Sequence, residues 1–175
     1  MQPSYKHYLK IIKNTCIGHE GPVTIPSEEL ADLARLAEEH CTIPFVLSAF
    51  RGTPFYPSML QRTRSMMLNY YQIDQFTRHT VSLLEDNGID CILLKGISLA
   101  SCYPVPEYRK LGDLDLYISQ KSDVSKAQKL LEANGYIAEN ELSDHHLTYH
   151  YTFPKTGRRF LLELHYRVVG MYQYE

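Results

Sequence analysis

Two carboxylates lie two residues apart in an otherwise apolar stretch, residues 112–118 (GDLDLYI). Alternation along an extended chain puts Asp113 and Asp115 on one face of a strand, a few ångströms apart. Leu114 and Leu116 then lie on the opposite, apolar face. Two like charges held this close are costly unless a cation neutralises them, and hard divalent ions such as Mg2+ do so with oxygen ligands. The stretch therefore predicts a strand with an apolar face and a metal-binding face.

A short apolar run and a glycine turn precede this acidic strand. Residues 91–94 (CILL) predict a buried strand, which Lys95 and Gly96 follow as a turn. A short helix is predicted at residues 98–103. Backbone N–H groups left free in such a turn bind phosphate oxygens. The turn and the acidic strand together indicate metal-assisted chemistry on a nucleotide.

Length and composition predict a cytoplasmic globular protein. The 175 residues are 44% hydrophobic, enough for one substantial core with or without a helical appendage. A net charge of −2 argues against bulk electrostatic affinity for nucleic acid. We expect no membrane span and no signal peptide, because no apolar run is long enough. The four cysteines are dispersed without a paired metal spacing, so neither a disulfide framework nor a cysteine zinc site is expected.

The first half of the chain has helical patterns. Ser27, two acidic residues and a following apolar stripe indicate an N-cap and an amphipathic helix. Residues 59–85 form a long periodic segment that predicts a second helix, which ends at Asn87-Gly88. We therefore assign residues 1–88 to a mainly helical N-terminal region.

The second half predicts a small mixed β-sheet with flanking helices. The predicted strands lie at residues 91–94, 114–118, 146–153 and 158–166. The last two flank a turn and form a hairpin. Ser122 is predicted to cap a helix over residues 123–133, which ends at Asn134-Gly135. Residues 89–175 then form an α/β core, and the whole chain belongs to the α+β class.

This order of motifs resembles the nucleotidyltransferase superfamily with the DNA polymerase β-like catalytic fold. Within it, an uncharacterised bacterial branch carries Leu-Lys-Gly, then an Arg, then Gly-Asp-(Ile/Leu)-Asp-Leu. The resemblance covers roughly residues 89–168, about half the chain. The matching residues here are Leu94, Lys95, Gly96, Arg109, Gly112, Asp113, Asp115 and Leu116.

The resemblance implies transfer of a nucleoside monophosphate from a nucleoside triphosphate to an acceptor hydroxyl or phosphate. It also implies a third carboxylate on a later strand, and Glu163 in residues 160–166 (FLLELHY) has the expected context. Asp113, Asp115 and Glu163 would be the catalytic and metal-binding residues, with two Mg2+ ions bound and Mn2+ as the alternative. The sequence does not define the acceptor, whether small molecule, protein or RNA, nor the nucleotide preference or the oligomeric state.

Four residues are candidates for binding the triphosphate: Lys95, Gly96, Ser98 and Arg109. Ile97 stands where the superfamily usually has serine or glycine, so Ser98 would serve in its place. A guanidinium at position 109 suits bidentate phosphate binding, and the alternative is an ion pair with Glu107 or the acidic pair. The alternative for Lys95 is a solvent-facing lysine at the end of a strand.

Two other interpretations stay open. The first is a catalytically inactive nucleotide-binding or regulatory module of the same fold, favoured by Ile97 and by the lack of a helical region after the last catalytic strand. We expect from this that the chain is a fragment of a longer protein. The second is a metal hydrolase, suggested by His145, His146, His150 and His165. Their spacing matches no established zinc motif, and strand histidines are usually packing or surface groups.

Overall fold

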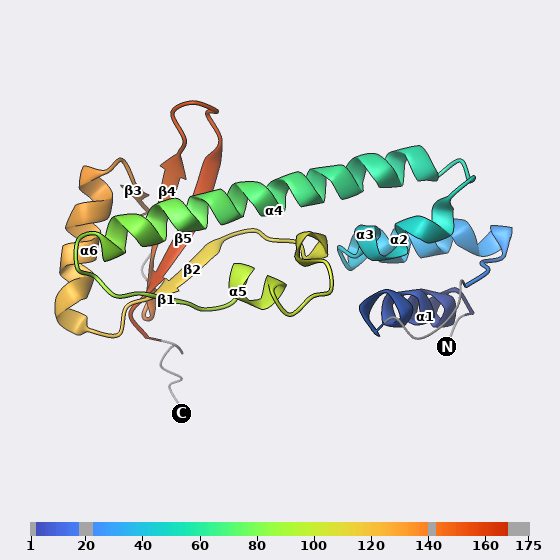
Figure 1. Ribbon diagram of the computed structural model, residues 1–175, viewed down its shortest axis with the longest axis horizontal. Coiled ribbons are helices and arrows are strands. Elements are labelled where there is room, and N and C mark those ends of the chain that lie inside the picture. Colours follow the sequence, from blue (N-terminus) through green and yellow to red (C-terminus); the bar gives the residue numbers. More distant parts are fainter. Residues whose placement is uncertain (1–2, 18–22, 140–142, 168–175) are drawn as a thin grey trace. The chain divides into compact units, whose positions relative to one another are not determined.

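The computed structural model describes residues 3–17, 23–139 and 143–167, and its elements are labelled in Figure 1. The chain is α+β, as predicted. It divides into two compact units, one made of Met1–Tyr71 and Ala100–Lys110 and the other of Gln72–Leu99 and Leu111–Glu175. None of the described helices is long and apolar enough to cross a membrane. Residues 168–175 lie outside the described part of the chain, and the expectation that the chain is a fragment of a longer protein stays a prediction.

The first unit is helical. Its helices are α1 (Pro3–Ile17), α2 (Leu30–Glu39), α3 (Ile43–Val46) and the first part of α4 (Tyr56–Glu85). Leu33, Ala37, Val46 and Phe50 are fully buried at its centre. The hydroxyl groups of Tyr8 and Thr42 share a hydrogen bond of 2.7 Å, which joins α1 to the start of α3. The core of this unit is therefore built by short helices packed on one another.

Two predicted helix caps are wrong. Ser27 begins a 3-10 turn, Ser27–Glu29, and α2 starts only at Leu30, without a side-chain cap. The preceding Pro26 carbonyl accepts the Glu29 N–H at 3.0 Å, so a tight turn takes the place of the predicted cap. Likewise α6 (Lys121–Ala133) begins one residue before Ser122, with Gln120 at the cap position and no side-chain bond.

The long helix α4 confirms the predicted segment and extends it by one turn, to Tyr56. Its C-terminal stop is also confirmed. Gly88 has φ +70°, and the Ile89 N–H bonds to the Leu84 carbonyl at 3.0 Å. A left-handed residue at this position satisfies the last helical carbonyls, and glycine adopts that conformation without the steric cost of a β-carbon.

The second unit contains a mixed sheet with strand order β1-β2-β5-β4-β3. Its strands are β1 (Ile92–Leu93), β2 (Leu114–Tyr117), β3 (Ile137–Ala138), β4 (His146–Thr152) and β5 (Arg159–His165). β2 and β5 are parallel, and the other pairs are antiparallel. The predicted hairpin is confirmed as β4 and β5, and β5 is a central strand between β2 and β4. Sequence patterns missed β3, which is only two residues long.

The prediction of a buried strand at residues 91–94 is wrong. β1 has two residues and pairs only with β2, so it is an edge strand of the described sheet. Ile92 is 55% exposed as a result. The following helix is also shorter than predicted, since α5 spans Ile97–Ala100. A run of apolar residues does not distinguish an edge strand from a central one.

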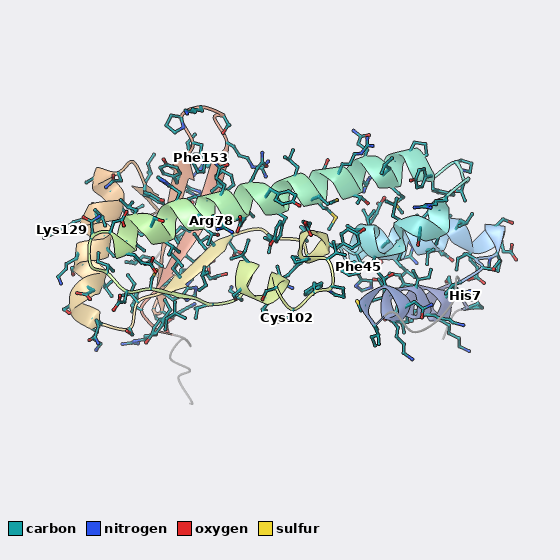
Figure 2. The ribbon with its side chains drawn as sticks, viewed as in Figure 1. His7, Phe45, Arg78, Cys102, Lys129 and Phe153 are labelled. Carbon is teal, nitrogen blue, oxygen red and sulfur yellow. The ribbon has the colours of Figure 1, made fainter. Side chains whose placement is uncertain are left out.

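One face of the sheet is a hydrophobic core. Leu114, Leu116, Leu162, Leu164 and Tyr149 are buried there. The C-terminal part of α4 covers this face, where Phe76 stacks on Phe160 at a centroid distance of 4.9 Å. Phe153, labelled in Figure 2, packs edge-on against the same two rings at the turn end of the hairpin. The opposite face of β2, β5 and β4 carries the polar residues.

We predict that Phe76→Ala lowers the free energy of unfolding by about 3–5 kcal/mol, because it removes a ring that is 1% exposed and leaves a cavity among aromatic neighbours. Urea denaturation followed by circular dichroism measures the change. Ile92→Ala is the control and should stay within about 0.5 kcal/mol, since its side chain is largely exposed. Equal effects of the two substitutions would contradict this assignment of the core.

Candidate active site

The register of three strands gathers polar side chains on one face of the sheet. Asp115 on β2 lies opposite Glu163 on β5. His146 on β4 lies opposite His165 on β5. Residues that face each other across a ladder point to the same side, as do side chains two apart on one strand. These four side chains therefore share the face opposite the hydrophobic core.

Asp115 is the buried acid of this face, with 1% of its surface exposed. Its Oδ1 atom lies 3.1 Å from Lys95 Nζ and 3.1 Å from His165 Nε2. Its Oδ2 atom is also buried and has no hydrogen-bond partner among the residues that the structure describes. A buried carboxylate oxygen without a donor or a cation is costly. The free oxygen therefore favours a cation at this side of Asp115.

Glu163 is half-buried beside Asp115. Its Oε2 atom lies 3.3 Å from His165 Nε2 and 3.9 Å from Lys95 Nζ. One potential ligand atom from each of Asp115, Glu163 and His165 lies within 4.8 Å of the others. The two predicted acids are thus brought together, and a histidine that the sequence did not assign to this site joins them. The sequence signal for this histidine was its position two residues after Glu163 on the same strand, which places the two side chains on one face.

Lys95 supplies the positive charge next to these acids. Its side chain is 58% exposed, yet Nζ lies against Asp115. The hydrogen bond to Asp115 raises the pKa of Lys95; partial burial opposes this, and the charges of Asp115, Glu163 and Asp113 add to it. Lys95 is therefore a stable ammonium group and neutralises part of the acidic cluster.

The turn at Gly96 comes close to the acids. Gly96 has φ +65°, and a β-carbon there would lie 3.6 Å from the Asp113 carbonyl oxygen and 3.9 Å from Asp115 Oδ2. Ser98 donates its hydroxyl to the Leu94 carbonyl and lies 3.3 Å from the Lys95 carbonyl. The turn backbone therefore lines the edge of the carboxylate site.

Asp113 and Arg109 lie in different surroundings from the buried acid. Asp113 is half-buried and belongs to no group of three close ligand residues among those the structure describes, although its charge acts on Lys95. Arg109 belongs to the first unit, where its guanidinium donates to Tyr103 Oη at 3.2 Å and lies over the Tyr103 ring. In the same unit Glu107 accepts a hydrogen bond from Tyr71.

Two further histidines lie beside His165 on its β4 side, away from Asp115 on β2. The ring centroids of His145 and His146 are 5.8 and 5.1 Å from that of His165. Burial lowers the pKa of His146; the Glu163 charge acts against this, and neighbouring positive groups reinforce it. His146 is therefore a neutral imidazole at neutral pH, with one nitrogen lone pair available.

A family model described as "Uncharacterised nucleotidyltransferase" matches residues 26–174. The chain therefore belongs to this nucleotidyltransferase family, which confirms the predicted superfamily. The match starts within the helical first unit and includes the whole described sheet. No curated protein matches the chain.

We predict that Gly96→Ala destabilises the protein by about 1–2 kcal/mol, because a residue with a β-carbon pays this cost in the left-handed region. Gly112→Ala is the matched control, since its φ lies outside that region and a β-carbon added there would meet no atom within 4 Å. It should leave stability unchanged or slightly higher. The free energy of unfolding in urea tests both, and a neutral Gly96→Ala would rule out the left-handed turn.

Proposed function

We propose that the protein is a metal-dependent nucleotidyltransferase that moves a nucleoside monophosphate from a nucleoside triphosphate to an acceptor. One observation carries the proposal: Asp115 and Glu163 lie opposite each other on parallel strands, beside the Gly96 turn, and Asp115 Oδ2 is buried with no partner among residues 3–17, 23–139 and 143–167. Membership in a nucleotidyltransferase family supports the reaction class.

The donor set fits a hard divalent metal. Asp115 and Glu163 offer carboxylate oxygens, and no described residue bonds to Oδ2 of Asp115. Asp113, two residues before Asp115 at the start of the strand, would complete the ligand set. Mg2+, with Mn2+ as the alternative, prefers such oxygen ligands, and we propose two ions. When bound, the ions neutralise triphosphate charge and polarise the reacting oxygens.

The protein's own residues would position the substrate and move a proton. The attacking acceptor oxygen forms a bond to the α-phosphorus, the bond to the β-phosphate oxygen breaks, and pyrophosphate leaves. Glu163 is our candidate to accept the proton from the acceptor hydroxyl. Lys95, the Gly96 backbone and Ser98 would contact the phosphates.

The partner and the location are also part of the proposal. The acceptor is a small molecule, a protein or an RNA. All four cysteines are free thiols, which supports a reducing compartment such as the cytoplasm. Labelled triphosphates incubated with the protein and cell extract would identify the acceptor by what becomes labelled.

A nucleotide-binding module without turnover is the second candidate. Lys95 already neutralises Asp115, and the Ser98 hydroxyl bonds to its own turn. The Lys95 contact favours a site in which an internal cation replaces part of the metal's role, and the Ser98 bond already uses the hydroxyl that would contact a phosphate. Mg2+-dependent binding of triphosphate without its consumption would identify this module.

We predict that Asp115→Asn and Glu163→Gln each abolish Mg2+-dependent release of pyrophosphate, because each removes a negative metal ligand. Asp123→Asn is the control, since Asp123 pairs with Lys126 on α6. It should keep wild-type turnover. Activity in either acidic-site variant comparable to that of the control would reject the carboxylate site.

We predict opposite effects of Lys95→Gln on two affinities. Without nucleotide, Mg2+ should bind several-fold more tightly, a change of up to about 1 kcal/mol, because a partly exposed competing cation is removed. The Mg2+ complex of a nucleoside triphosphate should bind more weakly, because the phosphates lose a positive contact. Calorimetric titrations measure both, and a parallel change in the two affinities would contradict the proposed role of Lys95.

A further inference from the structure

A group of three histidines lies at the end of the β4–β5 ladder. One ring nitrogen from each of His145, His146 and His165 lies within 4.8 Å of the others. The rings of His145 and His146 are 4.4 Å apart and nearly perpendicular. The proposed transferase reaction uses none of the three nitrogens as a phosphate or acceptor contact.

The two ring nitrogens of His165 have different surroundings. His165 is 5% exposed, and its Nε2 faces Asp115 Oδ1 at 3.1 Å and Glu163 Oε2 at 3.3 Å. Carboxylates accept hydrogen bonds, so Nε2 carries the proton and donates it. Nδ1 then has a free lone pair, and it is buried without a hydrogen-bond partner in the described part of the chain. Metal-binding histidines commonly have this arrangement, with the second nitrogen bonded to a carboxylate.

A local turn holds His145 and His146 on the same side as His165. Consecutive residues of a strand point to opposite faces, but His145 precedes β4 in a turn where both backbone N–H groups face Ser143 Oγ. The Tyr166 and Arg167 N–H groups bond to the His145 carbonyl at 3.0 and 3.2 Å. The end of β5 therefore fixes the backbone of His145.

The second nitrogen of His145 is also oriented by a carboxylate. His145 Nδ1 lies 2.7 Å from Asp144 Oδ1, so it is the donor and Nε2 keeps the lone pair. His146 Nδ1 lies 3.2 Å from Ser143 Oγ. Two of the three rings thus have the carboxylate partner that raises the basicity of a metal-binding imidazole.

We propose that His145, His146 and His165 bind a divalent transition metal of the Zn2+ class, at a site separate from the carboxylates. Imidazole nitrogens select Zn2+, Co2+, Ni2+ and Cu2+ over Mg2+, whereas carboxylate oxygens favour Mg2+. Three protein ligands leave a fourth position for water or a substrate oxygen, as in catalytic zinc sites. This site does not depend on nucleotidyl transfer.

Titration of the metal-free full chain with Zn2+ in excess Mg2+, against a coloured chelator, tests the proposal. We expect one tight equivalent. His145→Ala and His146→Ala should each weaken it by more than about a hundredfold, because loss of an outer partner alone costs roughly 10–100-fold. His150→Ala is the matched control and should bind as wild type, since His150 lies on β4 but pairs with Glu139. Circular dichroism confirms that each variant is folded.

Glu163→Gln distinguishes this site from the carboxylate site. Glu163 faces the Nε2 side of His165, so its variant should keep Zn2+ binding within about tenfold, the lower end for an outer partner. Visible absorption of bound Co2+ gives a second readout, which should be lost with His146→Ala and kept with Glu163→Gln. The proposal is overturned by the absence of tight Zn2+ binding, by wild-type binding in both histidine variants, or by loss only in Glu163→Gln.

Discussion

The parallel pairing of β2 with β5 is the constraint on which the site depends. It sets Asp115 opposite Glu163 across the ladder, although 48 positions separate them in the chain. The same register places Leu114 opposite Leu162 in the core. A slip of one residue would turn every one of these side chains to the other face. The energetic cost of exposing the leucines therefore also fixes the positions of the acids.

Charge balance is the second requirement of this face. Asp115 is buried, and a buried carboxylate is stable only when it is paired or hydrogen-bonded. Lys95 and His165 provide the partners of Oδ1, and Oδ2 has none within the described residues. Hydrogen bonds and ion pairs from these residues therefore satisfy only one of the two carboxylate oxygens of Asp115. Under the proposed function, the cation that would complete the bonding of this oxygen is also the metal that the reaction would use.

Local patterns predicted the elements that depend on neighbours in sequence. The hairpin, the long helix with its glycine stop and the polar face of β2 follow from period and turn chemistry, and all three are present. Burial of residues 91–94 and the caps at Ser27 and Ser122 were predicted wrongly. Strand position in a sheet and competition from a preceding 3-10 turn depend on contacts that a local pattern does not contain. The pairing of His165 with Asp115 needs the parallel register, which no short pattern specifies.

His165 links two chemically different groups through one ring. Its Nε2 faces oxygen ligands that suit Mg2+, and its ring lies beside two more imidazoles, which suit Zn2+. A proton held on Nε2 by the carboxylates leaves the lone pair on Nδ1, so the acids determine which nitrogen is available. Conversely, a metal on Nδ1 would make the Nε2 proton a stronger donor to Asp115. The two sites would then be coupled through a single buried side chain, without any movement of the backbone.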